Sequence, residues 1–218
     1  MKIILQAVLW VVIAFLGYLI YNSVQAPIEF EKVKKERYLP IIKTLKDVSK
    51  AESASRDIQG KYIGDWDSLV RFIDTAEYVI TERRDTSYLD VEFKRNYGVD
   101  KYISDIVIDT LGFYSVRDSI FKDNYEAYQN MMYVPGTNKS EKFDLTAGFI
   151  KDGKRKIAVF EASVDKSVIL ADQDKDFVIR ERKLQSVDDI SGPVIKVGDL
   201  NKVTDSGNWP KNYGKNQD

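Results

Sequence analysis

The first twenty residues constrain this chain most, because they form an uninterrupted apolar run. The segment from Ile3 to Tyr21, IILQAVLWVVIAFLGYLIY, carries no charged side chain. Its length approaches the ~20 residues that a helix needs to cross a hydrocarbon core of ~30 Å. Tyr18 and Tyr21 lie near one end, where interfacial aromatic residues gather. The segment predicts a transmembrane helix that contacts the lipid bilayer through residues 3–21.

A cleaved signal peptide is the alternative interpretation of this segment. Signal peptides usually have a shorter apolar run of ~7–15 residues. The one candidate cleavage motif, Val24-Gln25-Ala26, would leave Pro27 directly after the cut. We therefore expect residues 1–26 to be retained as a signal-anchor.

The orientation of the span follows from the charges around it. Basic residues between Lys32 and Arg37 follow the span, which favours a cytoplasmic domain by the positive-inside rule. The short N-terminal stub of a signal-anchor favours the opposite orientation, and long domains cross the membrane largely regardless of charge. We expect a single-pass inner-membrane protein whose C-terminal domain is periplasmic.

Two residue types are missing from the chain, and their absence restricts its chemistry. Without Cys there are no disulfides and no thiolate catalysis, and without His the commonest general base and most transition-metal ligands are lost. The net charge of −1 gives no reason to expect a nucleic acid partner. We expect the protein not to be an enzyme and to need no cofactor. A glycosidase using two carboxylates is the enzymatic alternative.

A helical stem over residues 28–59 is predicted to follow the span. From Pro40, which should kink the helix or start a new one, apolar residues recur at steps of three and four. These residues are Ile41, Ile42, Leu45, Val48, Ala51, Ala54 and Ile58. Gly60 should end the stem, and Asp65 should cap a second amphipathic helix. The expected apolar face of that helix comprises Trp66, Leu69, Val70 and Ile73.

Strand-like patterns dominate after Glu77. The clearest pair is KFDLTAGFI, from Lys142, and RKIAVFEASV, from Arg155, separated by a KDG hairpin turn. The runs DFVIRERKL and GPVIKVGDL are also predicted to be extended. We read DIVIDTLGFYSVRDSIF as two short strands around Gly112, whereas EAYQNMMYV suits a helix or a strand.

These patterns predict an α+β fold with three parts. A transmembrane helix continues into an amphipathic stem, and a mainly antiparallel sheet follows. The expected boundaries are 1–26 for the anchor, 27–204 for one soluble domain that includes the stem, and 205–218 for a polar C-terminal tail.

The stretch LKDVSKAESASRDIQGKYIGDWDSLVRFI, from Leu45 to Ile73, resembles the stem and first loop of type IV pilins and type II secretion pseudopilins. Those proteins have an apolar N-terminal helix, an amphipathic continuation and a break like Gly60–Tyr62 before a sheet. The chain lacks their basic leader and the Glu of their apolar helix. The resemblance therefore implies a pilin-like plan and not a processed filament subunit.

The tail GNWPKNYG, from Gly207, resembles the ends of uncharacterised single-pass bacterial envelope proteins. This second resemblance implies an envelope setting and no activity.

Three aspartates in DQDKD, Asp172, Asp174 and Asp176, are the candidate metal ligands, for Ca²⁺. A standard calcium-binding loop needs Gly at its sixth position and Glu at its twelfth. Those positions hold Phe177 and Lys183 here. An acidic solvated turn is therefore the main interpretation, with a Ca²⁺ site of another kind as the alternative.

Candidate partner-binding residues come from two regions. Arg83, Arg84 and Arg117 carry a side chain that is enriched at binding hot spots, although they also suit a solvated strand edge. Trp209 and Tyr213 lie in the polar tail, where no local apolar stripe can bury them. They either fold back onto the domain or form a docking motif.

These features together predict a structural or assembly subunit of a bacterial cell-envelope machine for secretion, surface motility or pilus-like assembly. Its partners would be envelope membrane proteins, bound through protein–protein contacts. The alternative is a membrane-tethered periplasmic binding module for a glycan, a peptide or Ca²⁺, which requires a concave pocket with convergent polar groups.

Overall fold

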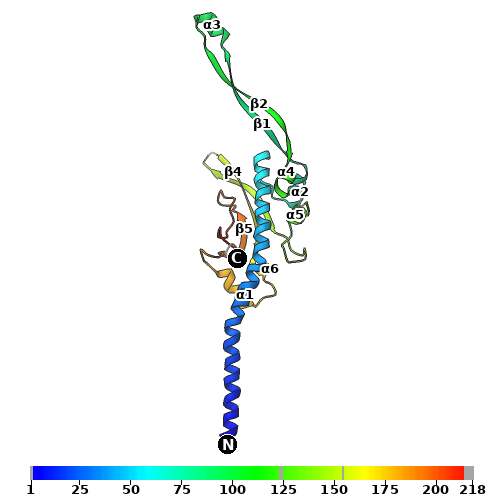
Figure 1. The fold of residues 1–218 in the computed structure, drawn as a ribbon, viewed down its shortest axis with the longest axis vertical. Coiled ribbons are helices and arrows are strands. Elements are labelled where there is room, and N and C mark those ends of the chain that lie inside the picture. The colour runs from blue at the N-terminus through cyan, green and yellow to red at the C-terminus, as the bar shows by residue number, and fades with distance from the viewer. Residues whose placement is uncertain (1, 123–124, 154, 214–218) are drawn as a thin grey trace.

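The computed structural model describes residues 2–122, 125–153 and 155–213, so Met1 and residues 214–218 of the polar tail lie outside the described residues. The fold is α+β, with a long N-terminal helix, a central domain and a projecting hairpin (Figure 1). Helix α1, Lys2–Gln59, is the one helix in the described ranges that is long and apolar enough to cross a membrane. Its N-terminal part stands clear of the domain, and large apolar residues between Ile3 and Val24 are exposed (Figure 1).

The anchor and the stem form one helix, because α1 neither ends nor restarts at Pro40. Of the two alternatives expected at Pro40, a kink or a new helix, the new helix is therefore wrong. The residues before and after Pro40 hold the helix in place, since Tyr38, Ile41 and Ile42 are buried against the domain. Helix α1 ends at Gly60, as predicted, where a positive φ of 73° and a bond from the Gly60 N–H to the Arg56 carbonyl close the last turn.

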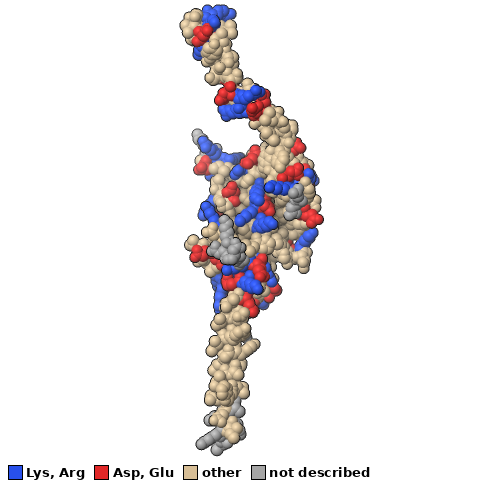
Figure 2. Space-filling view, viewed as in Figure 1, with Lys and Arg blue, Asp and Glu red and all other residues tan. Residues whose placement is uncertain are grey.

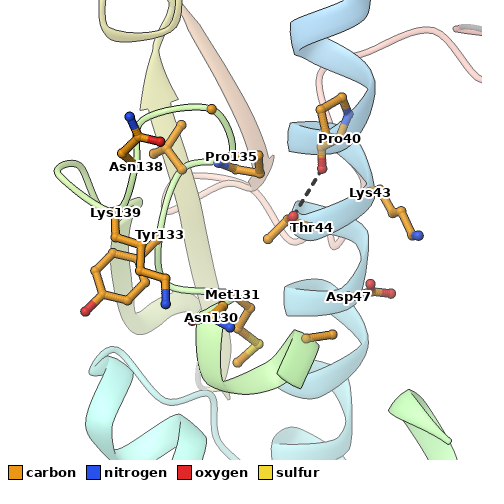
Figure 3. A pocket seen from close by; sticks show the side chains of 13 residues that line it. Pro40, Lys43, Thr44, Asp47, Asn130, Met131, Tyr133, Pro135, Asn138 and Lys139 are labelled. Carbon is orange, nitrogen blue, oxygen red and sulfur yellow. Dashed lines mark hydrogen bonds between the residues drawn. The ribbon is translucent and has the colours of Figure 1, made fainter. Parts of the chain in front are cut away.

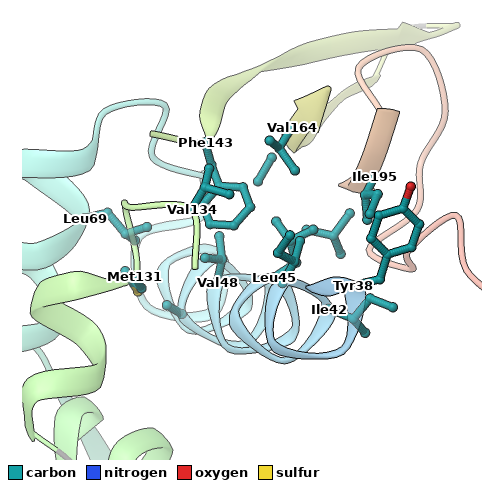
Figure 4. Packing of buried hydrophobic residues seen from close by; sticks show 14 of the residues in the cluster. Tyr38, Ile42, Leu45, Val48, Leu69, Met131, Val134, Phe143, Val164 and Ile195 are labelled. Atoms are coloured by element: carbon teal, nitrogen blue, oxygen red, sulfur yellow. The ribbon is translucent and has the colours of Figure 1, made fainter. Parts of the chain in front are cut away.

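The stem stripe forms the centre of the hydrophobic core. All its predicted members from Ile41 to Ala54 are buried, but Ile58 is 39% exposed near the helix end. Figure 4 shows the stem side chains facing two groups of residues from the rest of the domain. Leu69, Met131, Val134 and Phe143 lie towards one end of the stem, and Val164 and Ile195 lie towards the other (Figure 4).

A three-stranded antiparallel sheet covers one side of α1. It comprises β3, Asp144–Asp152, β4, Arg155–Asp165, and β5, Val194–Gly198, in the order β3-β4-β5. The predicted hairpin between β3 and β4 is confirmed, and Gly153 in its turn has a φ of +60°. The predicted GPVIKVGDL strand is also confirmed, as β5.

Short helices complete the domain. They are α2, Trp66–Thr75, α4, Val116–Phe121, α5, Tyr125–Asn130, α6, Lys166–Ile169, and α7, Lys175–Lys183. The predicted cap of α2 is confirmed, since Asp65 Oδ2 accepts a hydrogen bond from Ser68 N at 2.9 Å. Leu69 and Ile73 of its apolar face are buried together with Phe72, which the prediction omitted.

Two strand predictions are wrong. The run DFVIRERKL forms helix α7, because Asp174 caps its first turn and most of the residues after it are good helix formers. The run from Asp105 is one strand up to Ser115, followed by helix α4, which starts because the Ser115 side chain accepts from Asp118 N.

A buried ionic cluster joins α1, α6 and α7 near the point where α1 leaves the domain. The Lys166 ammonium group donates to Glu181 Oε1 at 2.7 Å, and Lys34 Nζ lies 3.2 Å from Glu181 Oε2. Lys34 also donates to Asp189 at 2.7 Å. Burial lowers the pKa of Lys34, but its bonds to Asp189 and Glu31 outweigh burial and raise that pKa above its usual value. Lys34 therefore stays charged at neutral pH.

Glu52 is a buried acid on the stem that faces no cation in the described part of the chain. Its Oε2 accepts a hydrogen bond from Ile63 N at 2.9 Å, while its Oε1 has no hydrogen-bond partner among the described residues. Burial raises the pKa of Glu52 to about 8, partly offset by the Ile63 N–H. Glu52 is therefore mainly protonated in the folded protein at neutral pH.

This shift predicts that stability falls as pH rises between 4.5, the ordinary pKa, and about 8. In that window the folded state binds a proton that the unfolded state has lost, so each pH unit weakens the fold. We expect Glu52→Gln to remove this loss and to be more stable than the wild type at pH 8 by roughly 2–4 kcal/mol. Urea unfolding of the full-length protein in detergent, followed by tryptophan fluorescence from pH 5 to 9, measures the difference. Glu36→Gln, at an exposed position of the same helix, is the control; equal pH slopes in the two variants would contradict the prediction.

Candidate functional site

The most prominent surface feature is a long two-stranded hairpin, which we call the arm (residues 77–115). It comprises β1, Glu77–Leu89, a tip helix α3, Val91–Tyr97, and β2, Tyr102–Ser115. The arm extends from the end of the domain opposite to the N-terminus (Figure 1). Any partner that binds its tip is therefore met far from the anchor.

Continuous backbone pairing holds the two strands together. The antiparallel register runs from Glu77↔Ser115 to Leu89↔Tyr102, with a bulge at Leu111, which has no partner on β1. β-branched and aromatic residues, which favour strands, make up much of both segments. The arm therefore forms from local pairing and does not depend on the domain core along most of its length.

Both ends of the arm are closed by specific hydrogen bonds. At the tip, the Asp90 side chain caps α3 by accepting from Phe93 N at 2.9 Å, and Gly98 ends the helix with a φ of 70°. At the base, Val116 N donates to the Ala76 carbonyl at 3.0 Å. The hairpin is thus anchored between α2 and α4.

The arm is unusual because it keeps large apolar side chains in solvent. Figure 2 shows mostly uncharged surface along it, interrupted by a charged group halfway along and by charges at the tip. Exposed large apolar residues of the arm are Val79, Ile80, Tyr88, Val91, Tyr97, Val99, Tyr102, Ile103, Ile106, Val107, Ile108, Leu111, Phe113 and Tyr114. Extended apolar surface of this kind marks interaction sites in soluble domains.

Within the part of the chain that the structure describes, the sheet of the arm contains only β1 and β2, so its two outer edges are unpaired there. A long exposed edge strand with apolar side chains is prone to pair with other chains unless something covers it or charges protect it. Charged residues in the middle of the arm, including the Arg84–Asp109 ion pair, provide part of this protection. The structure thus combines an interaction surface with features that limit unspecific pairing.

The predicted partner-binding arginines lie on the arm or at its base. Arg83 and Arg84 are both exposed in the middle of β1, and Arg84 pairs with Asp109. Arg117 lies in the first turn of α4, with its guanidinium 4.9 Å from the ring centre of Tyr125. Arg83 and Arg84 are adjacent in sequence and lie on opposite faces of the arm, and Arg117 lies on the domain, so the structure does not gather the three arginines into one site.

The other two predicted residues lie elsewhere, on the domain. Trp209 and Tyr213 are partly buried and pack against the core. Gly207 makes room for Trp209, because a Cβ on it would overlap the indole ring. Of the two interpretations of this tail, the described residues up to Tyr213 adopt the one that folds back onto the domain.

The three aspartates proposed as metal ligands have separate structural roles. Asp172 forms a two-point ion pair with Arg37, whose NH2 group donates to Asp172 Oδ2 at 2.8 Å, and this pair holds the pKa of Asp172 well below its usual range. Asp174 caps α7, and Asp176 lies in its first turn. In the described ranges no group of three or more acidic side chains is arranged to hold a metal ion. The Ca²⁺ site stays a prediction.

A surface groove of about 490 Å³ lies between the stem and residues 127–139. Figure 3 shows its labelled side chains: Lys43 and Asp47 point away from the loop that holds Tyr133 and Asn138, and Thr44 bonds back to the Pro40 carbonyl at 3.1 Å. A small-molecule site needs polar groups that converge on one point. This groove is therefore a weaker candidate than the arm.

The sequence interpretation missed the arm because it divided β2 at Gly112. The sequence does contain a signal for a hairpin, because two strand-like segments of similar length flank DVEFKRNYGVD. This stretch begins with an Asp that can cap a short helix and contains a Gly that can end it. Within β2, the triplet Ile106-Val107-Ile108 puts apolar side chains on both faces, unlike a strand with one face on a core.

Comparisons with family models, curated proteins and solved structures find no match to this chain.

Proposed function

We propose that this protein is a membrane-anchored structural or assembly subunit of a bacterial cell-envelope machine, and that its arm binds the other components. The observation that carries the proposal is the arm itself, with its exposed apolar side chains and its position opposite the anchor. Helix α1 would span the inner membrane and place the domain in the periplasm. The arm would then reach away from the bilayer to its partners.

The continuous α1 supports this positional mechanism. A helix rises ~1.5 Å per residue, so the 32 residues of the stem, 28–59, span on the order of 48 Å. Because the core is built directly on the stem, the domain is held at a set height and not on a flexible linker. The long apolar helix with a sheet domain around its continuation agrees in outline with the pilin-like plan, and secretion, surface motility or pilus-like assembly are the machines that we propose.

The proposal predicts that the arm can be shortened without unfolding the domain but not without losing partners. Thr81 and Thr110 face each other in the register, so an Asn-Gly turn can join them in place of residues 82–109. The removed segment is largely exposed, and we expect the free energy of unfolding to change by less than ~1 kcal/mol.

The test is affinity purification of the tagged full-length protein from its own membranes in mild detergent, with mass spectrometry of what copurifies. We expect envelope proteins in constant ratio with the wild type and their loss with the shortened arm. Glu36→Gln, a single substitution at an exposed position outside the arm, is the control. Recovery of the same proteins without the arm, or of none with it, would refute the proposed function.

A further inference from the structure

The register assigns every arm side chain to one of two faces. Side chains alternate along a strand, and directly paired residues share a face. One face, which we call the apolar face, therefore holds the odd-numbered residues of β1 and their partners on β2. Its large apolar members are Val79, Leu89, Tyr102, Ile106, Ile108 and Phe113.

The two faces differ in charge. The apolar face has three charged residues: Arg83 and Asp85, which are of opposite sign, and Glu77 at the base of the arm. The opposite face has four near its middle, Glu82, Arg84, Asp105 and Asp109, with an ion pair between Arg84 and Asp109. The opposite face can thus remain in water, whereas the apolar face gains most from being covered.

From these faces we infer that two copies of this chain, anchored in the same membrane, pack their arms together through the apolar face. The inference rests on the proposed function and names one partner of the arm as a second copy. The charges of Arg83 and Asp85 cancel, which leaves the apolar face with the single charge of Glu77 at its base, whereas the four charged residues of the opposite face sum to −2. Two copies therefore repel each other less through the apolar face than through the opposite face.

The exposed area of the apolar face matches a small dimer interface. Val79, Tyr102, Ile106, Ile108 and Phe113 are 44–64% exposed. With roughly 150–250 Å² for a fully exposed large side chain, they leave on the order of 600 Å² per copy, or about 1,200 Å² for two copies, in water. Stable interfaces begin at about 1,200 Å², and the polar rim adds to this area.

Because both copies are anchored in the same membrane, their arms can pack face to face more readily than they can pair edge to edge. Two copies inserted in one bilayer point in the same direction, so a two-fold axis must run along the membrane normal. Pairing β2 with β2 antiparallel, edge to edge, would turn the two anchors to opposite ends. Packing the faces keeps the arms parallel, and anchoring raises the effective concentration of the second copy.

In such a pair, equivalent residues lie at the same height. Because a two-stranded ribbon twists, the apolar face winds along the arm and the two arms would coil about each other. Ile108 of one copy then lies near Ile108 of the other, whereas Val107, its neighbour on the opposite face, points away from the second arm.

The absence of cysteine from the chain permits a direct test. Full-length Ile108→Cys and Val107→Cys proteins differ by one position and by face, and both native side chains are exposed, at 64% and 41%. After mild oxidation or a short bismaleimide in intact membranes, we expect a disulfide-linked or bridged dimer of Ile108→Cys at a several-fold higher yield than of Val107→Cys. Maleimide labelling of both variants confirms that the thiols are accessible.

Each outcome decides a separate question. Equal yields, or no dimer from Ile108→Cys, overturn the inference. An Ile108→Cys adduct with a different protein overturns self-pairing but leaves the proposed function standing. A dimer from Ile108→Cys, together with unchanged copurifying proteins after arm shortening, supports self-pairing and refutes the proposed function. As a second measurement, Ile108→Asp should abolish cross-linking between Cys residues introduced at Phe113, and Val107→Asp should not.

Discussion

Replacing Glu181 with glutamine is expected to cost about 3–5 kcal/mol of folding free energy, because it leaves two buried lysines without their shared carboxylate. Lys166 is fully buried, and its other hydrogen bonds among the described residues go to the Ile190 carbonyl, at 2.7 Å, and the Glu181 carbonyl, at 3.2 Å. Lys34 keeps Asp189 and Glu31, so Lys166 suffers most. Urea unfolding of the full-length protein in detergent at pH 7 measures the loss.

Glu161→Gln is the matched control for this substitution. Glu161 pairs with Lys196 at 2.7 Å, but both side chains are about one quarter exposed, and ion pairs open to solvent contribute at most ~1 kcal/mol. A second comparison replaces the whole cluster with Lys34→Met, Lys166→Met and Glu181→Leu together. We expect this triple variant to be more stable than Glu181→Gln alone. A loss in Glu181→Gln no larger than in Glu161→Gln would show that the cluster is not what holds α7 on the stem.

Gly198→Ala should be similarly destabilising, for a steric reason. Gly198 ends β5 with a φ of +75°, where a Cβ costs about 1–2 kcal/mol. That Cβ would also overlap the backbone carbonyl oxygen of Phe160, in a buried part of β4 that cannot move aside. We expect a total loss of about 3–5 kcal/mol, which corresponds to a fall in Tm of roughly 10 °C or more for a domain of this size.

The same sheet supplies the control. Gly148 lies in β3 with an ordinary φ, and a Cβ there would meet nothing within 4 Å. Gly148→Ala should therefore be neutral or slightly stabilising, by up to ~1 kcal/mol, since alanine restricts the unfolded chain. Thermal unfolding of both variants by circular dichroism separates the two cases. A small effect of Gly198→Ala would mean that β4 and β5 are less tightly apposed than their pairing indicates.

The parts of the fold that were predictable are those with strong local signals. The stem stripe, the stop at Gly60, the cap at Asp65 and the β3–β4 hairpin each follow from a periodicity or a turn residue. Helix α7 was not predictable from DFVIRERKL, because the aromatic and β-branched run Phe177-Val178-Ile179 resembles a strand until the Asp174 cap is recognised. An Asp such as Asp174 is favoured both at the start of a helix and in the turn before a strand, so the residue type alone does not distinguish the two.

The candidate site was harder to predict than the core. Neither face of the arm packs on the core, so its strands do not show the alternation of apolar and polar residues that marks a half-buried strand. Ile106, Val107 and Ile108, for example, put apolar side chains on both faces. Arg83 and Arg84 were selected for their residue type, and the structure then placed them on opposite faces of the arm. The buried cluster of Lys34, Lys166 and Glu181 joins residues more than a hundred positions apart, and no local pattern reports such a contact.

The continuity of α1 from Lys2 to Gln59 has a mechanical consequence. A helix turns by about 100° per residue, so a single residue inserted between the span and Phe30 would swing the domain and the arm around the membrane normal by that angle. Rotation of the helix within the bilayer is likewise passed on as torque, with no joint to absorb it. With α1 in the bilayer as proposed, the direction in which the arm faces would be set inside the membrane, by the contacts that the helix makes there.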